Sequence, residues 1–316
     1  MTDVFVDRFA YALGEQSRSV EEAAACGLTR SAANRLRAAG FTRHHVCATG
    51  TSAYDLARRV ALPLRSALEH IDVIVYATCL PLNAALGDAT AFAASRDVKD
   101  LMDFSASRLQ VELDLGAATV IGIDQQACTG MLGAVRVGSA LLRSEAATSR
   151  VLCITADRFP DGALYEQAYN LVSDGAAACV LSREPRGFRV LGCHAITNGA
   201  LARTTDDEVV GVYFTYTHRL VRETLANAGL GIDAIDWIVP QNMNVTGWTI
   251  LARLLGVDRR RVYCPTLGEV GHVISADNVI NLAHLDASGT LRSGQRVLLL
   301  MAGYGMHWQA VLLEKV

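Results

Sequence analysis

A short apolar segment occurs twice in this sequence, once in each half of the chain. The residues Ile-Asp-Val-Ile-Val at 71–75 return as Ile-Asp-Trp-Ile-Val at 235–239. Each copy follows a helical segment that carries arginines, 58–70 in the first half and 218–229 in the second. Each copy also precedes a second helix, a strand and a turn into a further helix. The repeat therefore predicts two similar halves related by a pseudo-twofold axis, with Cys128 and His272, which lie in the two turns, at equivalent places.

The periodicity of apolar residues predicts an α/β fold. Four short runs have the continuous apolar character of strands in a sheet that is covered on both faces; they are 71–77, 119–123, 151–155 and 176–181. Helical patterns alternate with them at 51–68, 105–113 and 130–143, as expected for layers of helices on sheets. Each half is predicted to close with a strand pair, 151–155 with 176–181 and 296–301 with 307–313.

The boundary between the halves is predicted near Ser182, because the stretch 182–207 is polar and has no clear periodicity. This division gives an N-terminal half at 1–182 and a C-terminal half at 183–316. The length of 316 residues is enough for one large two-part domain.

Composition limits the classes of function. Hydrophobic residues make up 51% of the chain and charged residues 19%, which indicates a large core or a buried oligomer interface. A net charge of −3 implies no general attraction to nucleic acid. No apolar run has the length of a membrane helix, and the N-terminus lacks the features of a signal peptide. We therefore expect a cytoplasmic protein that does not bind membranes.

The eight cysteines indicate neither a zinc site nor a disulfide framework, because no two of them form a C-x-x-C pair in this long, apparently cytoplasmic chain. A cysteine in this setting is usually a small buried apolar residue. That interpretation applies to Cys79, Cys153 and Cys179, which lie in strand-like runs.

Cys128 has a more specific setting. It follows an apparent strand and precedes a helix of small residues at 129–135. The N-terminus of a helix favours a thiolate over a thiol, and a thiolate is a good nucleophile toward a thioester carbonyl. Gly130 and Gly133 would allow another backbone or a pantetheine arm to approach. The residues alone leave two interpretations open, a catalytic nucleophile and a buried small side chain.

The run Asp-Gln-Gln-Ala-Cys-Thr-Gly-Met-Leu at 124–132 resembles the nucleophile elbow of the β-ketoacyl-acyl carrier protein synthase III family, in the thiolase superfamily. Three further landmarks follow in the family's order, at 173–178, 236–240 and 303–308. The resemblance implies the thiolase fold, a duplicated α-β-α-β-α sandwich of five layers with pseudo-twofold symmetry. It also implies that Cys128 carries an acyl group as a thioester.

The sequence departs from this family at two positions. The family has a histidine directly after Val-Pro and an asparagine in a later turn, whereas this chain has Gln241 and His272 there. An amide on the first loop and a histidine on the second resemble the thiolase branch of the superfamily. That likeness implies that His272 pairs with Cys128, as a base or as an imidazolium. Gln241, or Asn242 if the loop register shifts, would donate a hydrogen bond to a developing oxyanion.

The resemblance also suggests supporting groups. The backbone N–H groups of Cys128 and Tyr304 would form the oxyanion hole. Asp277, five residues after His272, would either orient the imidazole or lie on a helix surface. Thiolases use a second cysteine in the C-terminal glycine turn, and this chain has no thiol there; the nearby His307 is expected to point away from the pocket.

Two other polar pairs are expected to have no role in the site. Asp157 and Arg158 are expected to form a loop salt bridge. His44 and His45 are expected to form a solvated turn.

The leading functional hypothesis is a synthase III-like acyltransferase of specialised metabolism. It would move an acyl group from CoA or a phosphopantetheinyl carrier protein, through Cys128, to a carbon, nitrogen or oxygen nucleophile. One alternative is a decarboxylative β-ketoacyl synthase in which Gln241 and His272 hold the enolate. Another is a non-catalytic partner subunit of a heteromeric synthase. The resemblance implies a homodimer joined sheet edge to sheet edge and no bound metal or redox cofactor.

Overall fold

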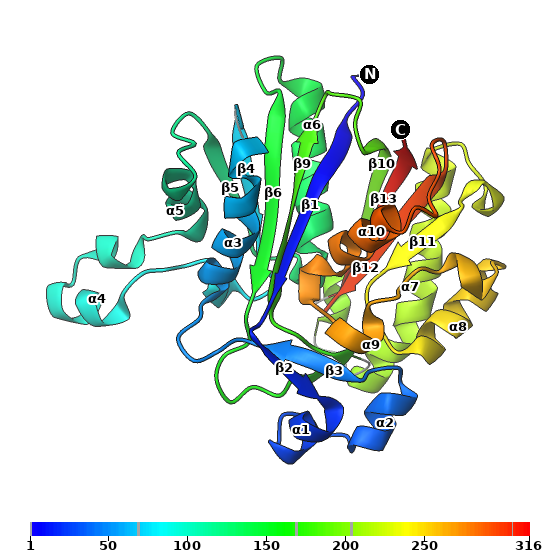
Figure 1. Ribbon diagram of the computed structural model, residues 1–316, viewed down its shortest axis with the longest axis horizontal. Helices are drawn as coiled ribbons and strands as arrows, with labels where there is room; N and C mark the ends of the chain where they lie inside the picture. The colour runs from blue at the N-terminus through cyan, green and yellow to red at the C-terminus, as the bar shows by residue number, and fades with distance from the viewer. Residues whose placement is uncertain (1, 68–69, 168–169, 203–204, 305) are drawn as a thin grey trace.

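The computed structural model describes residues 2–67, 70–167, 170–202, 205–304 and 306–316. Within these residues, the main sheet has nine strands and is mixed (Figure 1). In spatial order the strands are β11 (Trp237–Pro240), β12 (Arg296–Gly303), β13 (His307–Lys315), β10 (Phe188–Thr197), β1 (Phe5–Leu13), β9 (Gly175–Ser182), β6 (Arg150–Asp157), β4 (Val73–Ala77) and β5 (Thr119–Ile123). Two small antiparallel pairs lie apart from it, β2 (Gln16–Ser19) with β3 (Arg43–Val46) and β7 (Glu166–Gln167) with β8 (Asn170–Leu171).

The main sheet consists of two half-sheets. They join where β1 meets β10, and this join has only the pairs Phe5–Arg189 and Val6–Phe188. On one side of it β4 is parallel to β6, and β6 is antiparallel to β9. On the other side β11 is parallel to β12, and β12 is antiparallel to β13. The same arrangement thus occurs in each half, which confirms the predicted duplication.

The two copies of the repeated segment lead into equivalent strands, β4 and β11. The strand that should follow differs between the halves. In the first half β5 pairs with β4 over five residues, from Thr119 to Ile123. In the second half its counterpart is a single parallel bridge between Val262 and Ile238. Pro265 follows closely and has no N–H for a ladder, so the predicted strand is not extended there.

Three helical layers cover the faces of the half-sheets. The helices are α3 (Ala53–Ala61), α5 (Ser105–Glu112), α6 (Gly130–Ser144), α7 (Asp206–Asn227), α8 (Val245–Leu255) and α10 (Asp277–Ala287). The central core contains α6, α10 and the inner faces of both half-sheets. A second core lies under α3 and α5, and a third under α7 and α8. The five layers match the predicted sandwich. Along the described residues, no helix combines the length and the apolar character needed to cross a bilayer.

Small residues allow α6 to lie close to the sheet. A Cβ atom on Gly138 would come within 2.7 Å of the Leu181 side chain on β9. A Cβ atom on Gly133 would come within 2.0 Å of the Gln126 amide oxygen. Because there is no space for larger residues, the helix that follows Cys128 is held in one position against the strands.

Two strands of the main sheet were missing from the sequence prediction, as were the four short strands of the two small pairs. The stretch 182–207, expected to be irregular, contains the ten-residue strand β10. The alternation of buried and exposed residues along β10 is hard to recognise, because a register shift lies between Val190 and Gly192 and several residues of the strand are only partly buried. The other missing strand is β1. The predicted boundary falls directly after β9, which ends at Ser182, and the division into two domains there stays a prediction.

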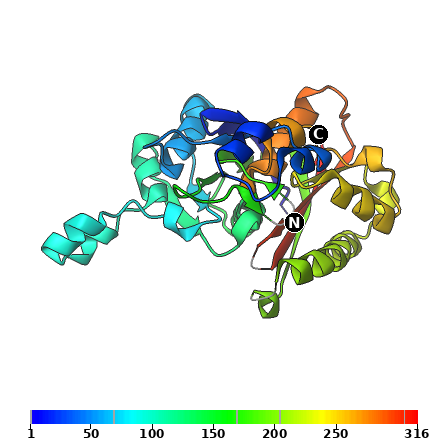
Figure 2. The same cartoon turned by 90° about the horizontal axis from the view of Figure 1, so that it is seen from below.

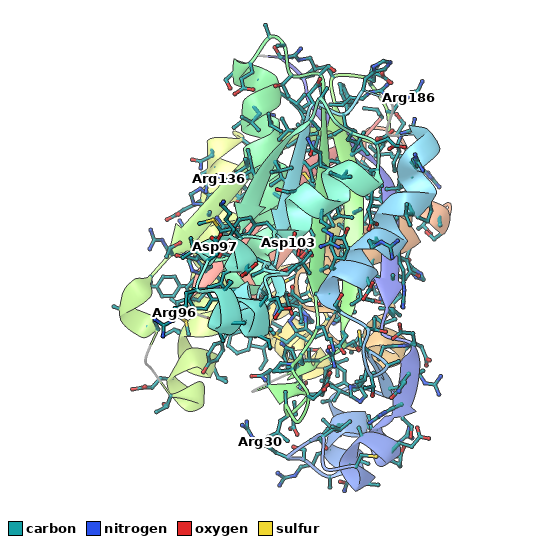
Figure 3. All side chains as sticks on the ribbon, turned by 90° about the vertical axis from the view of Figure 1, so that its left-hand side faces the viewer. Arg30, Arg96, Asp97, Asp103, Arg136 and Arg186 are labelled. Atoms are coloured by element: carbon teal, nitrogen blue, oxygen red, sulfur yellow. The ribbon has the colours of Figure 1, made fainter. Side chains whose placement is uncertain are left out.

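The remaining helices lie outside the layers. α1 (Val20–Ala25), α2 (Ala33–Ala38) and α9 (Leu267–Val270) lie next to β2 and β3 (Figure 1). α4 (Ala89–Ser95) and the short 3-10 helix at Val98–Leu101 form an arm that projects from the body (Figure 2). Arg96, Asp97 and Asp103 mark this arm in Figure 3. No residue of α4 is buried, and the arm exposes apolar side chains, including Val98, Met102 and Phe104.

Candidate functional site

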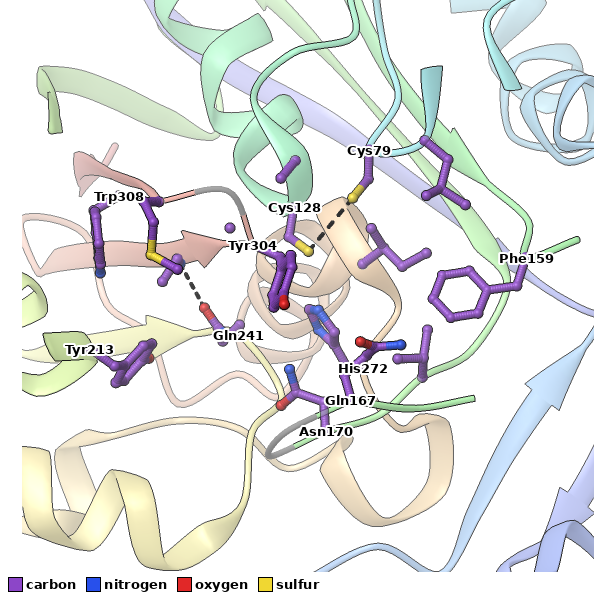
Figure 4. A pocket seen from close by; sticks show the side chains of 17 residues that line it. Cys79, Cys128, Phe159, Gln167, Asn170, Tyr213, Gln241, His272, Tyr304 and Trp308 are labelled. Carbon is purple, nitrogen blue, oxygen red and sulfur yellow. Dashed lines mark hydrogen bonds between the residues drawn. The ribbon is translucent and has the colours of Figure 1, made fainter. Parts of the chain in front are cut away.

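A cavity of about 270 Å³ lies where the two halves meet. Cys128 from the N-terminal half and His272 from the C-terminal half both line it (Figure 4). Most of the other wall residues are apolar or aromatic; they are Leu80, Ala127, Phe159, Val172, Tyr213, Ile274, Ala302, Met306 and Trp308. An apolar cavity with a few polar groups is typical of small-molecule sites.

A sharp turn presents Cys128 to this cavity. The short 3-10 helix Ala127–Thr129 connects β5 to α6, and Ala127 has a φ of +47°, which is unusual for a residue with a side chain. The corresponding turn of the second half is Ile274–Ala276, where Ile274 has a φ of +49°. By this correspondence the counterpart of Cys128 is Ser275. The predicted equivalence of Cys128 with His272 was therefore wrong by three residues.

The end of β12 approaches the same turn. A Cβ atom on Gly303 would lie 3.1 Å from the Cys128 nitrogen, so only glycine leaves the space in front of this N–H open. The Tyr304 backbone N–H hydrogen-bonds the Cys128 sulfur and lowers the pKa of the thiol. The two groups expected to form an oxyanion hole thus lie beside the Cys128 sulfur, and their action on an oxyanion stays a prediction.

His272 is held by a buried carboxylate. Its Nδ1 lies 2.5 Å from Oδ2 of Asp277, and both side chains are buried. The same carboxylate accepts hydrogen bonds from the backbone N–H groups of Val273, at 2.6 Å, and Asn242, at 2.7 Å. Asp277 was expected either to orient the imidazole or to lie on a helix surface. In the structure it is buried and orients the imidazole. With Nδ1 bound to Asp277, Nε2 is the nitrogen left for Cys128.

The electrostatics of the site favour a charged pair. Hydrogen bonding from Cys79 lowers the pKa of the Cys128 thiol well below its usual value; burial opposes this effect, and His272 adds to it. Burial also disfavours the His272 cation, but Asp277 and Cys128 outweigh burial and raise the pKa of His272 to about 10. A thiolate and an imidazolium therefore stabilise each other across the two halves.

The two amides near His272 have different surroundings. Gln241 lines the cavity, and its side-chain oxygen accepts a hydrogen bond from the Ala302 N–H at 2.6 Å. Its NH2 group is then the part that can donate to a ligand. Asn242 is fully buried outside the cavity lining, where its amide donates to Thr266 and to the Gly271 carbonyl. The geometry therefore supports Gln241 over Asn242 as the predicted donor.

Sequence reasoning missed a second thiol at the site. Cys79 was expected to be an inert strand residue, but it lies in the loop after β4, lines the cavity and has its sulfur 3.9 Å from that of Cys128 (Figure 4). Asp157 was expected to pair with Arg158. Its buried carboxylate instead accepts hydrogen bonds from the backbone N–H groups of Cys79 and Leu80. One feature of the sequence could have indicated this contact: Asp157 lies at the end of the apolar run that forms β6, and β6 lies beside β4.

Two histidines complete the comparison with the sequence. His44 was expected in a solvated turn, but it is fully buried in β3 and its Nδ1 lies 2.9 Å from the Val172 carbonyl oxygen. The ring of Tyr165 packs edge-on against it, with the ring centroids 5.3 Å apart. His307 lies outside the cavity lining and hydrogen-bonds Thr197, as expected for a side chain that points away.

Comparison with known proteins gives the same family at the level of sequence. The family model of 3-oxoacyl-[acyl-carrier-protein] synthase III matches residues 124–199. The model of the C-terminal part of the same family matches residues 225–315. Together these segments make up more than half of the chain. Beta-ketoacyl-[acyl-carrier-protein] synthase III of Rhizorhabdus wittichii is 28% identical, over 84% of each chain. A Streptomyces coelicolor protein of the same name, numbered 3, is 29% identical, over 87% of this chain and 86% of its own length.

Solved structures agree on the fold. ChlB3, described as an acyltransferase, superposes with a TM-score of 0.82 at 20% identity and covers 99% of this chain and 98% of its own. Xanthomonas campestris OleA superposes with a TM-score of 0.76 at 18% identity and covers 99% of this chain and 98% of its own. With the family models and the geometry of Cys128, these matches show that the chain belongs to the 3-oxoacyl-[acyl-carrier-protein] synthase III family of the thiolase superfamily.

Proposed function

We propose that this protein is an acyltransferase of specialised metabolism that carries its acyl group on Cys128 and passes it to a carbon, nitrogen or oxygen nucleophile. The observation that carries the proposal is the buried His272–Asp277 pair beside Cys128. A histidine held by a carboxylate is suited to remove a proton from an acceptor. The fold shared with ChlB3, described as an acyltransferase, is compatible with this chemistry.

In the loading step, the Cys128 thiolate attacks the carbonyl carbon of an acyl-CoA or acyl-carrier thioester. The N–H groups of Cys128 and Tyr304, with the NH2 group of Gln241, are the donors available for the developing oxyanion. The new bond joins the acyl carbon to the Cys128 sulfur, and the bond to the pantetheine sulfur breaks. The departing thiolate takes the proton from Nε2 of His272, which becomes neutral.

In the transfer step, neutral His272 acts as the base. Acylation removes the negative charge of Cys128, which is one of the effects that raise the pKa of His272. The acceptor attacks the thioester and gives its proton to His272, while the bond between the acyl carbon and the Cys128 sulfur breaks. The enzyme thus returns to the thiolate–imidazolium state without any other proton donor.

The alternative within the family is a decarboxylative β-ketoacyl synthase. Decarboxylation of a malonyl thioester needs donors for the enolate oxygen and no base. Gln241 and protonated His272 can both donate. The transferase also needs a base, and His272, held by Asp277 and neutral once Cys128 is acylated, can take the proton of the acceptor.

We also propose that the protein is a cytoplasmic homodimer. β5 is the edge strand of the main sheet and exposes an apolar residue, Val120. Edge strands of this kind pair readily with a second chain. The arm around α4, with exposed Val98, Met102 and Phe104, lies on the same side of the molecule as this edge (Figure 1) and adds apolar surface there. A heteromeric partner with the same kind of edge is the alternative.

Acyl loading tests the proposal directly. Incubation with acetyl-CoA and longer acyl-CoAs, followed by intact-mass measurement, should add one acyl group to the wild-type chain. Cys128→Ala should gain none, because the nucleophile is lost. Cys153→Ala, which removes a sulfur from the core, should still be acylated. Absence of any acyl gain by the wild-type protein, with CoA and carrier-protein donors alike, would instead support a non-catalytic subunit.

Release of carbon dioxide distinguishes the two reactions. Purified enzyme mixed with an acyl-CoA and malonyl-CoA, or malonyl carrier protein, should release carbon dioxide at the rate of a Cys128→Ala control. The reason is that the transferase reaction has no decarboxylation step. Malonyl-dependent release well above this control would favour the β-ketoacyl synthase and contradict the acyltransferase.

The pH dependence of alkylation tests the ion pair. Only the thiolate reacts with iodoacetamide, so the rate at Cys128 should have its midpoint well below pH 9 in the wild-type protein. His272→Gln removes the cation and should raise this midpoint by about 1–3 pH units. His307→Gln, outside the cavity, is the matched control and should leave the midpoint in place. An equal midpoint in all three proteins would show that His272 does not act on Cys128.

Sedimentation tests the dimer. The 33.9 kDa chain should sediment at twice this mass at micromolar concentration. Val120→Lys places a charge on the exposed edge of β5 and should shift the protein toward the monomer. Leu254→Lys, an equally polar change at an exposed position of α8, should not. A monomeric wild-type protein would contradict the proposal.

A further inference from the structure

A second thiol lies against the reacting sulfur. The Sγ atoms of Cys79 and Cys128 are 3.9 Å apart, and both line the cavity (Figure 4). The two residues come from different loops of the N-terminal half, one after β4 and one after β5. Within the family resemblance described above, the second thiol of thiolases would lie in the C-terminal glycine turn. Cys79 therefore brings a thiol to the same chemistry from another part of the fold.

The position of Cys79 is held by a buried acid. Asp157 accepts hydrogen bonds from the N–H groups of Cys79, at 2.9 Å, and Leu80, at 3.1 Å, and from the hydroxyl of Thr78, at 2.5 Å. Asn83 donates to the same carboxylate. Because four donors from one short loop converge on this side chain, the loop holds the thiol in a fixed place. A group that must act on a reacting atom needs support of this kind.

The two sulfurs differ in how strongly they hold a proton. Hydrogen bonding to Cys128 and burial raise the pKa of the Cys79 thiol. Cys128 has the imidazolium of His272 on its other side. The stable arrangement is therefore a Cys79 S–H group that donates to a Cys128 thiolate. Hydrogen bonds to an ionised acceptor are stronger than those between neutral groups.

A thiol pair without these surroundings is also present. Cys153 and Cys179 face each other across β6 and β9, and both are fully buried in the core. Neither lines the cavity. Proximity of two sulfurs is thus not what distinguishes Cys79. The distinguishing features are the shared cavity, the neighbouring histidine and the loop held by Asp157.

We propose that Cys79 is a second catalytic residue, whose S–H group donates to the Cys128 sulfur and stabilises it whenever that sulfur is an anion. This inference rests on the proposed acyl transfer. In loading, Cys79 favours the attacking thiolate. In transfer, the bond between the acyl carbon and the Cys128 sulfur breaks, and Cys79 donates to the departing thiolate. Cys79 keeps its proton throughout, and all proton exchange with substrates goes through His272.

The test compares Cys79→Ala, Cys79→Ser and the wild-type protein, with Cys153→Ala as a control, all under reducing conditions. The first measurement is the rate of Cys128 alkylation by iodoacetamide against pH, with peptide mass spectrometry to separate Cys128 from exposed Cys26. Cys79→Ala should raise the midpoint by about one pH unit, because a donor to the thiolate is lost. Cys79→Ser keeps a donor and should recover most of the shift.

The second measurement isolates the step in which Cys128 leaves. The protein is acetylated with acetyl-CoA, separated from it and mixed with free CoA, and the return of the acetyl group is followed by intact mass. Cys79→Ala should slow this return about tenfold, the factor that corresponds to one pKa unit of the leaving thiol. Cys79→Ser should be intermediate, and Cys153→Ala should match the wild-type protein. A residue with a merely structural role would not produce this order.

The proposal is overturned if Cys79→Ala and Cys153→Ala match the wild-type protein within twofold in both measurements. It is also overturned if Cys79→Ser is as impaired as Cys79→Ala. Should Cys79→Ala fail to fold, Cys79→Thr and Cys79→Val give a pair of equal shape with and without a hydroxyl donor. Failure of the wild-type protein to gain an acetyl or other acyl group would contradict the proposed function instead, and the alkylation profiles would still decide whether Cys79 donates to Cys128.

Discussion

The arrangement of the site depends most on the buried carboxylate of Asp277. It lies at the start of α10, where the N-terminus of a helix favours negative charge. Burial of an unpaired charge would be costly. Asp277 avoids this cost through hydrogen bonds from His272, the Val273 N–H and the Asn242 N–H. The same bonds join the loop after β11 to the turn that carries the histidine, so one side chain sets both the charge and the orientation of the imidazole.

A second layer of polar groups supports this carboxylate. The amide of Asn242 donates to Thr266 and to the Gly271 carbonyl, and Asn281 donates to the Asn242 oxygen. Because its members have partners, this buried network is rigid. The N-terminal half uses the same principle, since Asp157 holds the loop of Cys79. In each half a buried carboxylate thus binds backbone N–H groups and fixes one side chain beside Cys128.

Local patterns predicted much of the fold, and with the family resemblance they predicted five residues that lie at the candidate site: Cys128, Gln241, His272, Asp277 and Tyr304. The apolar runs that became β4, β5, β6 and β9 are continuous, and the small residues of α6 leave a clear pattern. Cys128 was found because it lies between an apparent strand and a helix of small residues. His272 was found through the internal repeat and the resemblance to thiolases, since α9 and no strand directly precedes it. Cys79 has no such motif. Its position depends on a contact between residues 49 positions apart and on Asp157 from a third strand. The carboxylate at the end of β6 becomes informative only once β6 is known to lie beside β4. β10 was missed because its bulge and its partly buried residues disturb the alternation that marks a strand.

In the duplicated fold, Cys128 and His272 come from different halves. The half-sheets share only two residue pairs, but backbone hydrogen bonds between the halves also form at the site: the His272 N–H donates to the Leu171 carbonyl at 2.7 Å, and the Ser173 N–H donates to the His272 carbonyl at 2.8 Å. These bonds fix the backbone of His272, and what remains is the position of Cys128 relative to it. That position is set in the central layer, where the turns before α6 and α10 adopt the same unusual conformation and the Ser275 hydroxyl donates to the Ala127 carbonyl at 3.3 Å. One turn carries Cys128, the proposed nucleophile. The other turn carries Ser275, whose hydrogen bond to Ala127 holds the first turn in place. His272 lies three residues before Ser275. Because both helices belong to one apolar core, the geometry of the proposed Cys128–His272 pair also depends on how this core packs.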